Sequence, residues 1–263
     1  MTNLKQKVAI ITGSAASIGE SIARHFHECG AAVVIADCNA EGGAALARDL
    51  GERAVFVETD ITDDSALDAL VEAAVERFGS LDILVNNACS YGDDGPQTDR
   101  DTWLGTLNTN VVSAALLGEK ARPHLKKAGG CIVNIGSISG VAPHIHRWAY
   151  PVSKAALIHL TRTQAVEYAD DGIRVNLLRL GHIWSAPFAG LTGDDRAHAD
   201  KVVTPYNLKG RVADGKEVAQ VAAFAASEEA SYVTGAEIPV DGGYTTLGPE
   251  RRDPLMALLS REA

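Results

Sequence analysis

Short apolar runs alternate with longer amphipathic stretches along most of the chain. The apolar runs are rich in Val and Ile, as strands are, and read KVAII, AAVVIAD, AVFVETD, LDILVNNA, GCIVNIGS, IRVNLLRL and AEIPVDG. Between them, stretches such as IGESIARHFHECG and SALDALVEAAVERFG place apolar residues three and four apart and stop at glycine, as helices do. Continuously apolar strands that alternate with helices predict an α/β fold, with one doubly wound parallel sheet and helices on both faces.

The alternation also predicts the domain organisation. No internal repeat, low-complexity tract or linker divides the 263 residues. We therefore expect a single domain over residues 1–248. The last stretch, residues 249–263, falls outside the alternation and is expected to be a C-terminal tail.

Composition excludes some classes of partner. A formal net charge of −10 and an isoelectric point near 5.2 argue against binding to nucleic acid or to an anionic membrane. No apolar run approaches the length of a membrane span, and the N-terminal stretch lacks the pattern of a signal peptide. The four cysteines form no CxxC pair, which favours reduced thiols over disulfides or a zinc site. We expect a cytoplasmic protein without a bound metal.

The stretch TGSAASIG, residues 12–19, follows the first expected strand and opens the first expected helix. Free N–H groups and positive partial charge at a helix N-terminus suit a pyrophosphate, and Gly13 and Gly19 permit a tight turn and close packing. Alone, the stretch also fits an ordinary turn. The second expected strand favours the phosphate site, because it ends in Asp37 at the roughly 20-residue interval typical of a carboxylate that binds the adenosine ribose.

Asp37 also bears on the choice of cofactor. A carboxylate at this position would repel the 2′-phosphate of NADP. No Lys or Arg lies in the loop, and Cys38 and Asn39 follow Asp37. The sequence therefore predicts NAD rather than NADP.

Tyr150 and Lys154 are four residues apart, so on a helix they share one face. Pro151 between them is tolerated only in a first turn, which predicts a helix that starts near Tyr150. The helix dipole and the ammonium group would lower the tyrosine pKa below its reference of about 10 and make it a general base. Ser137 closes the preceding strand and would bring a hydroxyl to the same cleft. The alternative is an ordinary Tyr–Lys pair at the surface.

Together these motifs resemble the short-chain dehydrogenase/reductase family over nearly the whole chain. The matching stretches are, in order, TGSAASIG, ETDIT, NNAC, the Ser137, Tyr150 and Lys154 set, RLGHIWS and TGAEIPVDGG. Each motif is modest evidence alone, but their order and spacing are specific. The resemblance implies a Rossmann fold, NAD as the cofactor and a homotetramer or a homodimer.

The resemblance also implies the site residues. The catalytic set is Asn110, Ser137, Tyr150 and Lys154, with Tyr150 as the base, Ser137 bound to the substrate oxygen and Asn110 holding a water of a proton relay. The cofactor-binding set is Gly13, Ala16, Ser17, Ile18, Gly19, Asp37, Asp60, Ile61, Asn87, Ala88, Tyr150, Lys154, Gly181, Ile183 and Ser185.

Three positions depart from the family pattern. Ser17 and Cys89 stand where the family has glycine, and Leu180 stands where it has proline. A Cβ at Ser17 costs room if the backbone needs a positive φ. We expect the N–H of Ser17 to face the pyrophosphate, with its hydroxyl free for a further hydrogen bond.

The family builds its substrate pocket from three variable segments, one of them a lid at about residues 186–211 here. The candidates are Tyr91, Ser139, His144, Arg147, His182 and Trp184. Arg147 would pair with a carboxylate or sulfonate, whereas the aromatic residues would suit an apolar cyclic alcohol. Both alternatives stay open.

The leading hypothesis is an NAD-dependent oxidoreductase that oxidises a secondary alcohol, such as a sugar or an anionic hydroxy compound, to the carbonyl. A carbonyl reductase working in the reverse direction is one alternative. A non-catalytic NAD-binding sensor or scaffold on the same fold is another, because fold alone does not determine function.

Overall fold

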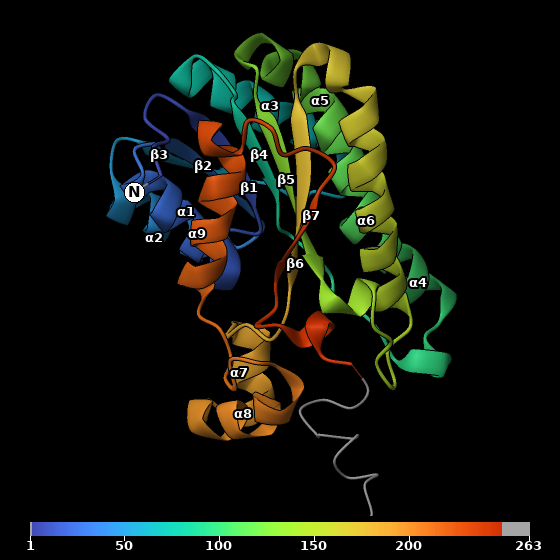
Figure 1. The fold of residues 1–263 in the computed structure, drawn as a ribbon. Coiled ribbons are helices and arrows are strands. Elements are labelled where there is room, and N and C mark those ends of the chain that lie inside the picture. The colour runs from blue at the N-terminus through green and yellow to red at the C-terminus, as the bar shows by residue number, and fades with distance from the viewer. Residues whose placement is uncertain (1, 249–263) are drawn as a thin grey trace, which may run out of the picture.

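A computed structural model of the protein describes residues 2–248 (Figure 1), where a parallel sheet of seven strands runs in the order β3-β2-β1-β4-β5-β6-β7. The strands are β1 (Val8–Thr12), β2 (Ala32–Asp37), β3 (Ala54–Glu58), β4 (Ile83–Asn86), β5 (Cys131–Ser137), β6 (Arg174–Leu180) and β7 (Glu237–Val240). Six of them lie within the apolar runs, and β1 extends one residue beyond KVAII, to Thr12. The prediction of a doubly wound parallel sheet is confirmed.

Helices cover both faces of the sheet. They are α1 (Ser17–Glu28), α2 (Ala40–Leu50), α3 (Asp64–Phe78), α4 (Arg100–Leu107), α5 (Ser113–Ala128), α6 (Ala149–Glu167), α7 (Ala186–Thr192), α8 (Arg196–Val203) and α9 (Gly215–Ala226). Helices α1, α2 and α9 pack on one face, and α3, α5 and α6 pack on the other (Figure 1). Helices α7 and α8 lie apart from both layers, beyond the carboxyl end of β6 (Figure 1).

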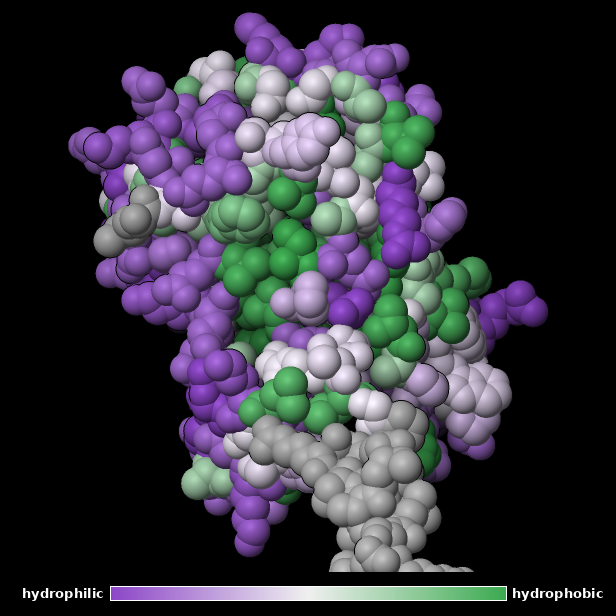
Figure 2. Space-filling view, viewed as in Figure 1, coloured by the Kyte–Doolittle hydropathy of each residue, from purple (hydrophilic) through white to green (hydrophobic). Residues whose placement is uncertain are grey.

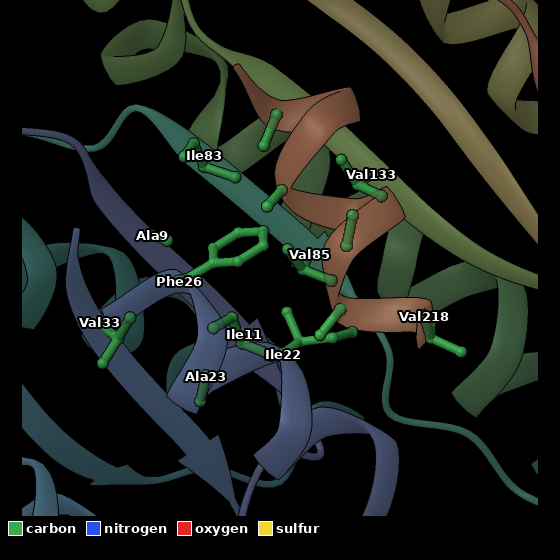
Figure 3. Packing of buried hydrophobic residues seen from close by; sticks show 14 of the residues in the cluster. Ala9, Ile11, Ile22, Ala23, Phe26, Val33, Ile83, Val85, Val133 and Val218 are labelled. Carbon is green, nitrogen blue, oxygen red and sulfur yellow. The ribbon is translucent and has the colours of Figure 1, made fainter. Parts of the chain in front are cut away.

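The spacing of apolar residues on α1 explains how this helix packs on the sheet. Phe26 lies four residues after Ile22 and three after Ala23, so the three side chains share a stripe that is fully buried. Figure 3 shows Phe26 and Ile22 directed from α1 toward the sheet, where Val85 of β4 lies, with α9 beside them. Burial of a side chain such as Phe26 contributes about 1.5–3 kcal/mol to stability.

The strand order places a crevice at the middle of the sheet. From β1 the chain runs outward through β2 and β3, and it then returns to β4 on the other side of β1. The loops that leave β1 and β4 therefore diverge at the carboxyl edge, which is where open α/β sheets bind their ligands.

The surface in the same view is divided by polarity. Figure 2 shows hydrophilic residues over the outer side of α1 and α2 and apolar residues through the middle. That middle region corresponds to the β7 edge between α9 and α6 in Figure 1. Strand β7 is only partly buried, so the apolar surface on this face follows the edge of the sheet.

The domain limits stay predictions. The proposed lid, residues 186–211, contains α7 and α8 and the turn that follows them. The proposed tail, residues 249–263, lies outside the described residues.

Candidate active site

The loop between β1 and α1 requires two glycines. Gly13 has a φ of +62°, and a Cβ there would lie 2.7 Å from the Cα of Ala88. A Cβ on Gly19 would lie 2.1 Å from the carbonyl oxygen of Gly13. Asn87 donates from Nδ2 to the carbonyl oxygens of Thr12 and Gly13, at 2.9 Å each. The loop is thus held against the end of β4, at the crevice.

Ser17 adopts a backbone conformation that favours glycine, with a φ of +57°. Its hydroxyl oxygen accepts a hydrogen bond from the N–H of Ala186, the first residue of α7, at 3.0 Å. The start of α7 therefore uses one acceptor position of this hydroxyl, while its O–H stays available as a donor, so a further hydrogen bond to the cofactor stays a prediction. Ser17 connects the loop to the segment proposed as the lid.

Two substitutions at Ser17 separate the cost of its positive φ from the contribution of its hydrogen bond with Ala186. We expect Ser17→Ala to lower the free energy of unfolding by about 1 kcal/mol, because it loses the acceptor and keeps a Cβ at positive φ. Ser17→Gly loses the same acceptor but relieves the strain, so its stability should lie near that of the native protein. Thermal unfolding measures both. Equal destabilisation in the two variants would show that the φ of Ser17 carries no cost.

Asp37 lies at the end of β2, beside the loop. Its Oδ2 accepts from the N–H of Ala15 and its Oδ1 from the N–H of Asn39, at 2.9 Å each. A cleft of about 420 Å³ opens here, and none of its lining residues is Lys or Arg. The predicted cofactor residues in its lining are Gly13, Ala16, Ser17, Ile18, Gly19, Asp37, Asp60, Ile61, Asn87, Ala88 and Ser185.

A second cavity, of about 520 Å³, continues from the first. The two share Ile18, Asn87, Cys89, Tyr91, Ser185 and Pro187. The remaining predicted cofactor residues, Gly181, Ile183, Tyr150 and Lys154, line the second cavity together with Ser137. The structure thus brings all the predicted cofactor residues to one continuous space.

Ser137, Tyr150 and Lys154 meet in the second cavity. Ser137 ends β5, and Tyr150 lies in the first turn of α6, with Pro151 directly after it as predicted. The Lys154 side chain is buried, and its Nζ donates to the carbonyl oxygen of Ile135 at 2.9 Å. The same Nζ lies 5.6 Å from the centre of the Tyr150 ring. A lysine held in this way places a fixed positive charge beside the phenol.

The pKa of Tyr150 is raised, not lowered as the sequence predicted. Burial of the phenol is the main cause, because an apolar environment disfavours the phenolate. The positive charge of Lys154 and a hydrogen bond with the Ser137 side chain oppose the rise without reversing it. The spacing of Tyr150 and Lys154 in the sequence indicates that an ammonium group lies near the phenol, but it does not indicate how far the phenol is buried.

Asn110 is buried in a π-helical turn, Asn108–Val112, between α4 and α5. Its Oδ1 accepts from the N–H of Ser90 at 2.7 Å, and its Nδ2 donates to the Ser90 carbonyl oxygen and to Ser153 Oγ at 2.9 Å each. The residue lines neither cavity. It connects the loop after β4 to α6, the helix of Tyr150.

Five of the six substrate candidates line the second cavity: Tyr91, Ser139, His144, Arg147 and His182. The ring of Tyr91 stacks on that of Tyr150, with the ring centres 5.2 Å apart. Burial lowers the pKa of His144 and of His182, so both imidazoles are neutral at pH 7. Within the described residues, His144 Nε2 and His182 Nδ1 are buried without a hydrogen-bond partner.

The sixth candidate, Trp184, lies elsewhere. Its ring packs against Phe188 and beneath the guanidinium of Arg196, and it borders a small apolar cluster under α8. It lines neither cavity. The structure therefore gives Trp184 a packing role in the proposed lid.

The sequence motifs did not predict a role at this site for Asp93. Asp93, in the loop after β4, accepts hydrogen bonds from the N–H groups of Trp148 and Tyr150, at 2.8–2.9 Å. These donors are more than 50 positions away. In the sequence Asp93 is one of two adjacent aspartates in a glycine-containing loop, a pattern that indicates only a turn.

A dinucleotide fits the residues of this site. The α1 N-terminus faces the cleft for a pyrophosphate, Asp37 is placed for ribose hydroxyls, and the second cavity holds a serine, a tyrosine and a lysine together. Within the described residues no group of three or more His, Cys, Asp or Glu side chains could hold a metal ion. Fold and site together define the class of oxidoreductases that bind a nicotinamide dinucleotide.

Comparison with known proteins shows to which family within this class of oxidoreductases the chain is similar. A family model described as Enoyl-(Acyl carrier protein) reductase matches residues 13–245. The chain is 42% identical over 248 residues to cis-4-hydroxycyclohexanecarboxylate dehydrogenase of Sinomonas cyclohexanicum, covering 92% of this chain and 98% of the relative. It is 34% identical to meso-2,3-butanediol dehydrogenase of Serratia marcescens, covering 91% and 94%. It is 36% identical to trans-4-hydroxycyclohexanecarboxylate dehydrogenase of Sinomonas cyclohexanicum, covering 94% and 96%.

The chain belongs to the short-chain dehydrogenase/reductase family. It is accordingly an oxidoreductase for small hydroxy compounds, and its cofactor is NAD or NADP. No helix in the described part of the chain is long and apolar enough to cross a membrane.

Proposed function

We propose that this enzyme uses NAD to oxidise a secondary alcohol on a small ring that carries a carboxylate. One observation carries the proposal: Ser137, Tyr150 and Lys154 line one cavity together with Arg147, and that cavity continues into the cleft at Asp37. The first three supply the chemistry of alcohol oxidation. Arg147 supplies a site for an anion.

The cleft favours NAD over NADP. The Asp37 carboxylate is held by two backbone N–H groups at the point where an adenosine ribose would bind. A 2′-phosphate beside it would meet a like charge, and no Lys or Arg lines the cleft to offset the repulsion.

The chain's own residues provide a path for the proton. Tyr150 accepts the proton of the substrate hydroxyl at its phenolic oxygen, and Ser137 holds the same substrate oxygen by a hydrogen bond as its charge changes. Lys154 stabilises the phenolate by its charge. A bound NAD would supply the hydride acceptor for the substrate carbon. The proton relay through a water at Asn110 remains a proposal.

The second cavity matches a small ring with one acidic substituent. Ile138, Ile183 and Phe188 contribute apolar walls, and a volume of about 520 Å³ accommodates a six-membered ring beside a nicotinamide. Arg147 donates to the carbonyl oxygen of Tyr91 at 3.3 Å, and no Asp or Glu of the described residues is paired with it. A substrate carboxylate would provide that missing partner.

The names of two relatives agree with this class of substrate, because both act on a hydroxycyclohexanecarboxylate. The direct test follows NADH formation from NAD with cis- and trans-4-hydroxycyclohexanecarboxylate, cyclohexanol, 2,3-butanediol and L-fucose, and repeats it with NADP. We expect the carboxylated rings to give the highest kcat/KM. Turnover of ketones by NADPH alone would favour the reductase, and cofactor binding without turnover of any compound would favour the sensor.

Arg147→Gln tests the anion site. We expect the variant to raise KM for 4-hydroxycyclohexanecarboxylate by about 10- to 100-fold, because a charge-assisted hydrogen bond is lost. Turnover of cyclohexanol, which has no carboxylate, serves as the internal control and should change less than about twofold. An equal loss with both alcohols would mean that Arg147 only supports the loop structure.

Assembly and location remain predictions. The family resemblance implies a homotetramer or a homodimer, which the molar mass in solution measures directly. The expected cytoplasmic location is tested by fractionating cells that produce the protein.

A further inference from the structure

We infer that Asp93 is a positioning residue for Tyr150, supplying from a distant loop the N-terminal cap of α6. The inference rests on the proposed role of Tyr150 as the base. It concerns a residue that lines neither cavity and that the sequence motifs do not include.

The first turn of α6 lacks a local cap. Trp148 occupies the N-cap position and offers no side-chain hydrogen bond to the helix. The first N–H groups of a helix have no partner within it and are usually satisfied by a Ser, Thr, Asp or Asn at that position. At α6 the cap is instead provided by Asp93, which lies 55 residues before Trp148 in the chain.

The contacts of Asp93 are those of a cap. Trp148 N–H donates to Oδ1 at 2.9 Å and to Oδ2 at 2.8 Å, and Tyr150 N–H donates to Oδ2 at 2.9 Å. The carboxylate is itself fixed, because the N–H of Gly95 donates to Oδ1 at 3.0 Å and the hydroxyl of Thr98 at 3.3 Å. Burial raises the pKa of Asp93, but the backbone N–H groups outweigh it and keep the pKa below the ordinary value. The carboxylate is therefore ionised at neutral pH.

The same loop makes two further contacts with the site. Its Ser90 is held at both backbone groups by Asn110, and the ring of Tyr91 stacks on Tyr150. Asp93 adds a hydrogen bond to the backbone of Tyr150 itself. The loop thus contacts Tyr150 at two points. Tyr91 packs on its ring, and Asp93 accepts a hydrogen bond from its backbone N–H.

Removal of the Asp93 carboxylate should therefore lower the rate of catalysis and leave cofactor affinity unchanged. Without the carboxylate, the first turn of α6 loses its partners and the phenol departs from the position where it meets the substrate hydroxyl and Ser137. A misplacement of a reacting group by about 1 Å can cost about 100-fold in rate. The cleft for NAD contains no contact with Asp93, so cofactor affinity should be preserved.

The experiment compares Asp93→Ala, Asp93→Asn and Asp94→Ala. We expect Asp93→Ala to lower kcat about 10- to 100-fold with the Kd for NAD unchanged within twofold. Asp93→Asn keeps one acceptor oxygen and should retain more of kcat than the alanine variant. Asp94 is the matched control, because it is the adjacent, exposed aspartate and its carboxylate has no hydrogen bond in the described structure.

Amide hydrogen exchange gives a readout that does not need a substrate. The N–H groups of Trp148 and Tyr150 should exchange faster in Asp93→Ala than in Asp94→Ala, while those in the last turns of α6 are unchanged. Native kcat in a folded Asp93→Ala, or an equal loss of NAD affinity and kcat, would overturn the inference. If Asp93→Ala does not fold, native kcat and exchange in Asp93→Asn would overturn it. Activity retained by Tyr150→Phe would instead overturn the proposed function, while faster exchange in the Asp93 variants would still support the cap.

Discussion

Tyr150→Phe is expected to reduce alcohol oxidation by about a thousand-fold while the Kd for NAD changes by less than about threefold. The substitution removes only the phenolic oxygen, which is the group that we propose accepts the substrate proton, and general-base catalysis contributes about 10²–10⁴ to a rate. The ring still packs against Tyr91, so the cavity keeps its shape. Steady-state kinetics and NAD titration by fluorescence provide the two measurements.

Tyr91→Phe is the matched control. Tyr91 lines the same cavity, and its ring stacks on that of Tyr150. We expect this variant to keep kcat within about tenfold of the native enzyme. Comparable losses in both variants would contradict the assignment of Tyr150 as the base.

The pH dependence should follow the raised pKa of Tyr150. A base must be unprotonated to accept a proton, and burial favours the protonated phenol at neutral pH. The rate of oxidation should therefore rise as the pH increases toward that pKa, and the reverse reduction should be faster at lower pH. A rate of oxidation that is already constant from pH 6 upward would contradict the raised pKa in the functioning enzyme.

Asp37→Asn is expected to reduce the preference for NAD over NADP by about 10- to 100-fold. The change removes the charge that would repel a 2′-phosphate, and it keeps one oxygen for the N–H of Ala15 or of Asn39. The ratio of kcat/KM for the two cofactors measures the effect. The gain should fade as ionic strength rises, because the repulsion is electrostatic and the site is partly exposed.

Asp60→Asn provides the control for Asp37→Asn. Asp60 lines the same cleft, and its carboxylate accepts from the N–H and the hydroxyl of Thr62. Its substitution also removes one negative charge from the cleft but leaves Asp37 in place, so the cofactor preference should stay within about threefold. An equal change in both variants would show that total charge, rather than the position of Asp37, sets the preference.

The local pattern of the chain was enough to predict most of the fold. The apolar runs correspond to all seven strands of the described sheet, and the stretch that carries Ile22 and Phe26 forms α1. Pro151 correctly placed Tyr150 in a first helical turn. These features follow from backbone sterics and from the period of apolar residues, both of which act over a few neighbouring residues.

The sequence was less reliable for properties that depend on surroundings. Charge spacing predicted a lowered Tyr150 pKa, and burial reversed the sign. The sequence did not indicate that the Ser17 hydroxyl accepts a hydrogen bond from the start of α7, 169 positions away. Trp184 was expected in the substrate pocket and instead packs under α8.

By itself, then, the sequence determined the parallel sheet, the glycine loop at its crevice, the position of Asp37 and the set of Ser137, Tyr150 and Lys154. Only the tertiary structure decided how deeply Tyr150 is buried and which loop caps its helix. The physical reason is that periodicity and turn chemistry are local, whereas desolvation and the pairing of distant donors with a carboxylate such as Asp93 depend on every element packed around the group.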